Sequence, residues 1–256
     1  MNMRLKSEKD IEIMVEGGKR HGDIMRMLES FVRPGISTKM IEDEALRLIT
    51  EGGDKSALLG YKPRGAKRDF PANTCISVNE EIVHGIPNEK ERILEEGDIV
   101  SIDLGLLHKG LITDSAITVA VGKIDKDSQD LIEATRHALN AGIEEAKPGK
   151  TVGDIGYAIS ESVKHSGFSV VHDLCGHGVG FAVHEDPFVP NFGERGEGEV
   201  LVPGLVIAIE PMLALGKGDI KLLSDGYTIR TKDGSRSAHF EHTVAITEKG
   251  NIILTS

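Results

Sequence analysis

Two aspartates lie in a hairpin whose neighbouring residues are apolar. The stretch 98–121 reads as two β-strands joined at Lys109-Gly110, and the first strand carries Asp103 while the second carries Asp114. A glycine-containing connection of this length is typical of a hairpin turn, so the two carboxylates should lie nearly opposite each other. Carboxylates repel each other and resist burial. The pattern therefore indicates a cation between them, most simply a metal ion.

An internal repeat supplies matching carboxylates in the second half of the chain. LEEGDIVSID, ending at Asp103, parallels LVPGLVIAIE, ending at Glu210, and DSAITVAV, starting at Asp114, parallels EHTVAITE, starting at Glu241. Two further parallels keep the same order, because a Pro-Gly pair precedes a helix in each half and IVHGIP matches AVHEDP. The repeat predicts an α+β fold of two pseudo-symmetric halves, with a central antiparallel sheet and outer helices.

The repeat also sets the expected domain organisation. The two halves cover about 34–122 and 148–250, and an N-terminal helix over about 7–32 precedes them. We expect all of these to form a single catalytic domain over 1–256, since the length suits one large domain.

Three local features complete the expected structure. Residues 54–74 hold prolines, glycines and several basic residues, and read as an exposed loop. The pairs Asp225-Gly226 and Asp233-Gly234 are each typical of a hairpin turn. A last strand is expected over 238–247.

The four carboxylates and one histidine could form a single metal centre. Any one of Asp103, Asp114, Glu210 and Glu241 alone could be a strand-end carboxylate facing water, but four at matching repeat positions favour a shared site. His177 lies between glycines in CGHGVG. A lone histidine is more often structural, yet this one lies in the half that supplies two of the carboxylates. Such a set can hold two divalent cations about 3.5–4 Å apart, and oxygen-rich ligands favour Mn²⁺ or Fe²⁺ over a thiolate-type zinc site.

Composition excludes several other classes of protein. The chain has 256 residues, 39% of them hydrophobic, and a formal net charge of −11, which argues against a nucleic-acid-binding surface. No stretch approaches a membrane span and the N-terminus has no apolar signal core, so we expect a cytoplasmic protein. Cys75 and Cys175 do not have the close spacing of cysteines that bind a metal ion. A chain with only these two cysteines is typical of a reducing cytosol.

The motifs together resemble those of type I methionine aminopeptidases, which are metallopeptidases of the pita-bread (creatinase/aminopeptidase) fold. The similar segments are SVNEEIVHGIP, GDIVSIDLG, TDSA, GHGVGFAVHEDP, IAIEPM and SAHFEHTVAI. The resemblance covers nearly the whole chain. It implies a metal-dependent aminopeptidase that removes the N-terminal methionine from nascent polypeptides whose second residue is small.

The resemblance also assigns roles to individual residues. His84 and His184 are implied to contact the substrate and the tetrahedral intermediate, and Glu210 is expected to move a proton as well as to bind metal. The implied metal ligands are Asp103, Asp114, His177, Glu210 and Glu241, which would hold two divalent ions (Mn, Fe, Co or Zn).

A methionine pocket is implied as well. Tyr61, Cys75 and Tyr227 match positions that line it, although plain core packing is the alternative for each. The segment from Tyr61 to Cys75 is longer than in familiar bacterial relatives, and Val183 stands where an aromatic residue is common. These two departures concern the shape of the pocket rather than the chemistry.

Three other assignments compete with this one. An Xaa-Pro-type aminopeptidase would carry a large extra N-terminal domain, and a type II methionine aminopeptidase would carry a helical insertion between Glu210 and Glu241. A non-catalytic pita-bread binding module would lack one or more of the five ligands. The expected partners are nascent polypeptide N-termini. Transient association with the ribosome would suit such a substrate, but no motif in the sequence indicates it. We expect a monomer that binds neither nucleic acid nor membrane.

Overall fold

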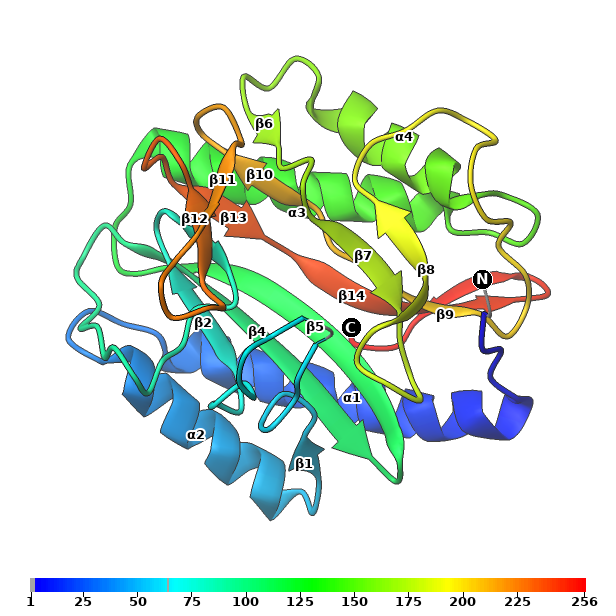
Figure 1. Ribbon diagram of the computed structural model, residues 1–256, viewed down its shortest axis with the longest axis horizontal. Coiled ribbons are helices and arrows are strands. Elements are labelled where there is room, and N and C mark those ends of the chain that lie inside the picture. Colours follow the sequence, from blue (N-terminus) through cyan, green and yellow to red (C-terminus); the bar gives the residue numbers. More distant parts are fainter. Residues whose placement is uncertain (1–2, 64) are drawn as a thin grey trace.

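The strands and helices of the protein form three sheets and two helix pairs. This computed structural model describes residues 3–63 and 65–256 (Figure 1). The helices are α1 (Glu8–Phe31), α2 (Thr38–Glu51), α3 (Lys126–Glu145) and α4 (Val152–Val163). The strands of the large sheet are β1 (Lys55–Ser56), β2 (Cys75–Val78), β4 (Ile99–His108), β5 (Leu111–Ala120), β7 (Cys175–Gly178), β8 (Glu185–Pro190), β9 (Val206–Ile209), β14 (Glu241–Thr247) and β15 (Gly250–Ile253). The small sheets contain β6 (Ser169–Val170), β10 (Met212–Ala214) and β13 (Ser237–His239), and β3 (Glu81–Val83), β11 (Ile220–Leu222) and β12 (Ile229–Thr231).

The large sheet joins the two halves of the chain side by side. Its order is β1-β4-β5-β14-β9-β7-β8, with β2 beside β4 and β15 beside β14, and every pairing is antiparallel. In Figure 1, α1 and α2 lie at one end of the molecule and α3 and α4 at the other, with the sheet between them. This arrangement confirms the predicted α+β architecture of a central antiparallel sheet with outer helices.

Both halves begin with the same helix–turn–helix geometry. Gly35, between α1 and α2, donates its N–H to the carbonyl of Leu94 at 2.8 Å, and Gly149, between α3 and α4, donates to Leu201 at 2.9 Å. Their φ angles are +89° and +84°, a left-handed conformation that favours glycine. The repeat seen in the sequence is therefore present in the backbone, and it extends to the helix before each Pro-Gly pair.

The helices form where their sequence signals place them. Ser7 caps α1, and its capping box with Asp10 matches the expected start of the N-terminal helix. Each helix pair packs its apolar face on its own half of the sheet. Leu28 and Ile41 join one buried cluster, while Leu139 joins another with the second-half strands, so each half has its own core behind the central strands.

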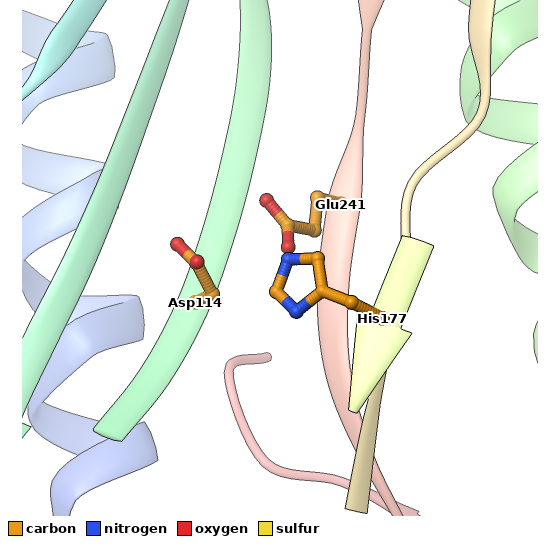
Figure 2. Close-up of side chains that lie close together, drawn as sticks. All are labelled: Asp114, His177 and Glu241. Atoms are coloured by element: carbon orange, nitrogen blue, oxygen red, sulfur yellow. The ribbon is translucent and has the colours of Figure 1, made fainter. Parts of the chain in front are cut away.

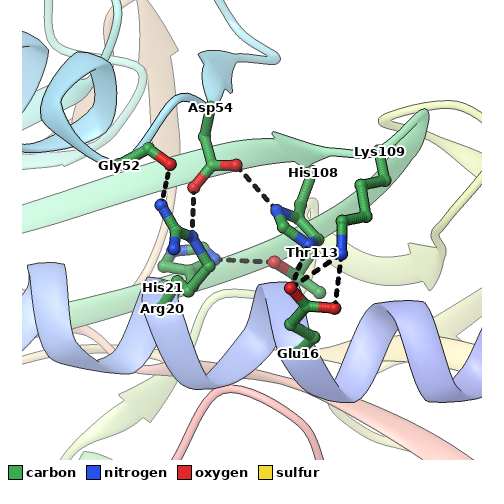
Figure 3. A network of polar contacts seen from close by, with 8 residues as sticks. All are labelled: Glu16, Arg20, His21, Gly52, Asp54, His108, Lys109 and Thr113. Carbon is green, nitrogen blue, oxygen red and sulfur yellow. Dashed lines mark hydrogen bonds and ion pairs between the residues drawn. The ribbon is translucent and has the colours of Figure 1, made fainter.

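A polar cluster fastens the tip of the β4–β5 hairpin to α1 and to the end of α2 (Figure 3). His108 Nδ1 lies 2.7 Å from Asp54 Oδ1, and the other oxygen of Asp54 accepts a 2.6 Å hydrogen bond from Arg20 Nε. Lys109 in the turn donates to both oxygens of Glu16 at 2.7 and 2.8 Å. Because the same hairpin carries Asp103 and Asp114, these contacts also fix the carboxylates relative to the helices.

The expected exposed loop over residues 54–74 is exposed only in part, so that prediction is partly confirmed. Lys62, Lys67 and Asp69 are exposed, whereas the two ends of the segment are buried. Leu58, Phe70 and Thr74 have exposed fractions of 7%, 4% and 0%. The backbone N–H groups of Asn73 and Thr74 donate to the two carboxylate oxygens of Glu42 on α2, at 2.7 and 3.0 Å. This tertiary contact, together with β1 pairing on β4, draws a segment of polar composition into the fold.

Two strand predictions near the C-terminus were wrong. Asp225-Gly226 does join the paired strands β11 and β12, but Asp233-Gly234 joins β12 to β13, which belong to different sheets. The carboxylate of Asp233 accepts the backbone N–H of Lys217 at 3.0 Å and so holds this turn toward the segment before β11. The expected single strand over 238–247 is broken at Phe240 into β13 and β14, and β15 was not predicted.

Candidate metal centre and substrate cavity

One cavity of about 130 Å³ collects every residue that the sequence analysis assigned to the site. Its lining also includes residues that the sequence analysis left unassigned. The predicted site residues in the lining are Tyr61, Cys75, His84, Asp103, Asp114, His177, His184, Glu210, Tyr227 and Glu241. The further lining residues are Leu58, Pro63, Phe70, Val83, Val183 and His239.

Strand register places three of the carboxylates on one face of the sheet. Asp103 of β4 pairs with Ala116 of β5, and Ala116 pairs in turn with Glu241 of β14. Asp114 stands two residues before Ala116, and residues two apart on a strand share a face. Asp103 and Asp114 are thus offset by two positions rather than opposite, and the small side chain of Ala116 leaves room between the acidic groups.

The second half of the chain contributes the remaining two members. His177 lies on β7 and Glu210 directly follows β9, with His177 Nε2 3.4 Å from Glu210 Oε1. The other ring nitrogen, Nδ1, lies 2.9 Å from the carbonyl of Gly178, which leaves Nε2 as the nitrogen for a metal. Asp114, His177 and Glu241 each offer a ligand atom within 4.8 Å of the others (Figure 2).

The chemistry of this cluster suits divalent cations. Asp114 Oδ1 and Glu241 Oε1 are buried and have no hydrogen-bond partner among the described residues. Burial raises the pKa of Glu210 to about 8 and that of Asp103 to about 6, and it raises the pKa of Asp114 and Glu241 well above the ordinary value. Burial lowers the pKa of His177 to about 3, so its imidazole is neutral and able to bind metal. The ionised form of a buried carboxylate without hydrogen-bond partners is stable only beside a positive charge. This set of ligand atoms therefore fits a divalent metal ion.

Two further histidines line the cavity beside the acidic cluster. His84 follows β3 with a φ of +59°, a left-handed conformation that non-glycine residues adopt mainly where function requires it. Burial lowers the pKa of His84 to about 4. The ring of His184 lies 4.2 Å from the ring of His177, and its Nδ1 shares a 2.7 Å hydrogen bond with the hydroxyl of Tyr61. Each half of the chain thus brings one non-ligand imidazole to the centre.

The other end of the cavity is apolar. Phe70 and Tyr227 meet edge-on with ring centroids 5.1 Å apart, and the Tyr227 hydroxyl donates to the carbonyl of Arg68 at 2.5 Å. Phe70, in the segment between Tyr61 and Cys75, lines this end together with Val183.

Among the polar residues of the cavity lining, the sequence analysis missed His239. Its imidazole is 2% exposed and neither ring nitrogen has a hydrogen-bond partner among the described residues. Comparison of the two halves gives no signal for it, because Ile112 stands at the matching position two residues before Asp114. Strand alternation could have found it, since it precedes Glu241 by two residues.

Comparison with known proteins identifies the family of this chain. The model of metallopeptidase family M24 matches residues 12–248, so the chain belongs to that family. The methionine aminopeptidase of Aquifex aeolicus is 46% identical over 259 residues, which cover 100% of this chain and 99% of that protein. Methionine aminopeptidase 1 of Bacillus subtilis is 44% identical over 250 residues, or 98% of each chain. The crystal structure of methionine aminopeptidase from Thermotoga maritima superposes with a TM-score of 0.94 at 41% identity and covers 100% of both chains.

Within residues 3–63 and 65–256, none of the helices has both the length and the apolar character needed to cross a bilayer.

Proposed function

We propose that this protein is a methionine aminopeptidase that removes the N-terminal methionine from polypeptides whose second residue is small. The observation that carries the proposal is the cavity itself, in which a largely buried cluster of four carboxylates and an imidazole lies beside an apolar end. The full-length likeness to bacterial methionine aminopeptidases supports the same activity.

The proposed centre holds two divalent metal ions through Asp103, Asp114, His177, Glu210 and Glu241. When bound, such ions lower the pKa of a water molecule and polarise the scissile carbonyl. A donor set of four carboxylates and one imidazole favours Mn²⁺ or Fe²⁺, with Co²⁺ and Zn²⁺ as substitutes.

The chain's own residues would carry the proton transfers. The Glu210 carboxylate would accept the proton of the attacking water and pass it to the departing amine. His84 and His184 line the same cavity as the acidic cluster and would donate hydrogen bonds to the oxygen on which negative charge develops. The hydrogen bond from Tyr61 keeps His184 oriented for this task.

The apolar end would receive the methionine side chain. Tyr61, Phe70 and Tyr227 offer aromatic contacts to the thioether sulfur, and Leu58 and Cys75 complete the wall. A second residue with a large side chain would collide with the crowded acidic centre, which accounts for the preference for small residues at that position.

The proposed setting is the cytoplasm, with nascent polypeptide N-termini as substrates. We propose a monomer that acts as a single catalytic domain and engages the ribosome at most transiently. The non-catalytic binding role has no supporting observation among the described residues, since all five ligand positions are filled and lie around one cavity. Xaa-Pro activity is less well supported than methionine removal, because the relatives that match over their full length are methionine aminopeptidases.

Hydrolysis of two tripeptides by the purified protein tests the proposed activity. With Mn²⁺ or Co²⁺ present we expect release of methionine from Met-Ala-Ser and no cleavage of Ala-Pro-Ala. Cleavage of Ala-Pro-Ala alone would assign the protein to the proline-specific branch. A metal-loaded protein that cleaves neither peptide would be a binding module.

A further inference from the structure

A buried ion pair ties the N-terminal segment to the loop that carries His184. Lys6 Nζ lies 2.7 Å from Glu185 Oε2, and the two side chains are only 1% and 3% exposed. The partners are 179 positions apart in the sequence, and neither lines the cavity. Desolvation of a buried charge pair costs free energy, so the pair contributes little net stability compared with an apolar pair. We therefore look for its role in the segments that it positions.

Glu185 organises the turn immediately before it. Its second oxygen, Oε1, accepts the backbone N–H of Phe181 at 2.6 Å and that of Ala182 at 2.8 Å. One carboxylate therefore closes the turn over residues 181–185. Val183 and His184 lie inside this turn, and both line the cavity.

Lys6 is itself held in place from several directions. Its backbone N–H donates to the carbonyl of Gly204 at 2.7 Å, and its ammonium lies 5.0 Å from the centre of the Phe181 ring. A Cβ added to Gly180 would come within 2.4 Å of Lys6 Cε, so the lysine stem passes directly against the backbone at the start of the turn. The ammonium can reach Glu185 only because position 180 has no side chain.

We propose that Lys6 is a positioning residue for His184, acting through Glu185 and the turn that Glu185 closes. The inference rests on the proposed function, in which His184 contacts the reacting carbonyl. Without Lys6 the buried Glu185 carboxylate has lost its positively charged partner, so it moves toward water and releases Phe181 and Ala182. His184 then loses its place, whereas the carboxylates on the sheet keep theirs.

The test compares Lys6→Met with Lys6→Arg and with Lys9→Met, an exposed lysine in the first turn of α1. We expect Lys6→Met to lower kcat for Met-Ala-Ser by about tenfold or more, while the affinity and stoichiometry of Co²⁺ binding stay unchanged. Lys6→Arg should retain most of the activity because it restores the charge, and Lys9→Met should match the wild type. A wild-type kcat in Lys6→Met would overturn the proposal, as would a parallel loss of metal binding and activity.

The double variant Lys6→Met/Glu185→Gln covers the case in which the single variant does not fold. The introduced glutamine would be neutral and its side-chain oxygen could still accept from the turn, so the double variant should recover activity relative to Lys6→Met. An equal or deeper loss would contradict the proposed route through Glu185.

Nitrogen NMR of the imidazoles in the Zn²⁺-loaded protein supplies a readout that needs no activity. Lys6→Met should shift the His184 Nδ1 signal, which reports the hydrogen bond to Tyr61, and leave the His177 signals in place. An unchanged His184 signal would overturn the proposal. If the wild type binds metal but releases no methionine, the proposed function fails, and this spectrum still decides the role of Lys6.

Discussion

His239 Nε2 lies 3.6 Å from Oε2 of Glu210, whereas His177 Nε2 lies 3.4 Å from Oε1, the other oxygen of the same carboxylate. The carboxylate proposed to move the proton is therefore placed between two buried imidazoles. His177 is a proposed ligand, whereas His239 has no hydrogen-bond partner among the described residues. An N–H of His239 directed at Oε2 would fix the orientation of the carboxylate.

Two substitutions of His239 should distinguish its hydrogen bond to the Glu210 carboxylate from the space that its side chain fills. His239→Leu leaves Oε2 without its donor, and we expect kcat to fall about 10- to 100-fold. His239→Gln keeps an N–H donor and should stay within a few-fold of the wild type. The d–d absorption of the Co²⁺-loaded protein should change in the leucine variant and much less in the glutamine variant. Wild-type kinetics and spectrum in His239→Leu would remove His239 from the site.

His84 should matter for turnover and not for metal binding. It is not among the proposed ligands, so His84→Ala should bind Co²⁺ with wild-type stoichiometry. Loss of its hydrogen bond to the developing oxyanion should lower kcat by about 10²-fold or more. Steady-state kinetics with a parallel metal titration checks both halves of the prediction, and normal turnover would show that His84 has no part in the reaction.

The metal-free protein should become more stable as the pH falls from about 8.5 to about 7. Glu210, Asp114 and Glu241 have folded pKa values above their ordinary values because of burial. A raised carboxyl pKa contributes stability at low pH that is lost as the pH rises through the folded value, by up to about 1.4 kcal/mol per pH unit and group. The buried imidazoles are neutral in the folded and in most of the unfolded chains across this window, so they do not oppose the trend.

Melting temperatures in chelator at the two pH values test this dependence. The higher value is expected at the lower pH, and Glu210→Gln should weaken the dependence because it removes one of the titrating groups. With Mn²⁺ present the difference in melting temperature between the two pH values should shrink or reverse, since protons and metal ions compete for the same oxygens. A chelated protein that is more stable at the higher pH would contradict the raised pKa values.

Local patterns were sufficient to predict much of this fold. The hairpin with Asp103 and Asp114 follows from alternation and the turn at Lys109-Gly110, and the observed register agrees with it to within two residues. The repeat then located Glu210 and Glu241. These four carboxylates are predictable because the strand pattern that buries their apolar neighbours also determines which face of the sheet each carboxylate lies on.

The features that were missed depend on contacts between distant segments. The end of the segment 54–74 is buried because Glu42 accepts the backbone N–H groups of Asn73 and Thr74. His239 has no counterpart in the first half, and the pairing of Lys6 with Glu185 spans 179 positions. Neither composition nor periodicity carries a signal for the contacts of Glu42 and Lys6, whereas the two-residue spacing of His239 from Glu241 is such a signal.

A metal titration of the chelated protein, with methionine release from Met-Ala-Ser measured at each step, tests the central claim most directly. Activity should be absent in the chelated protein and should rise with bound Mn²⁺ or Co²⁺ in the wild type. Asp114→Asn, which removes a carboxylate from the middle of the cluster, should bind less metal and remain inactive. Full activity in the chelated wild type, or in Asp114→Asn, would contradict the assignment of this cavity as a metal-dependent aminopeptidase centre.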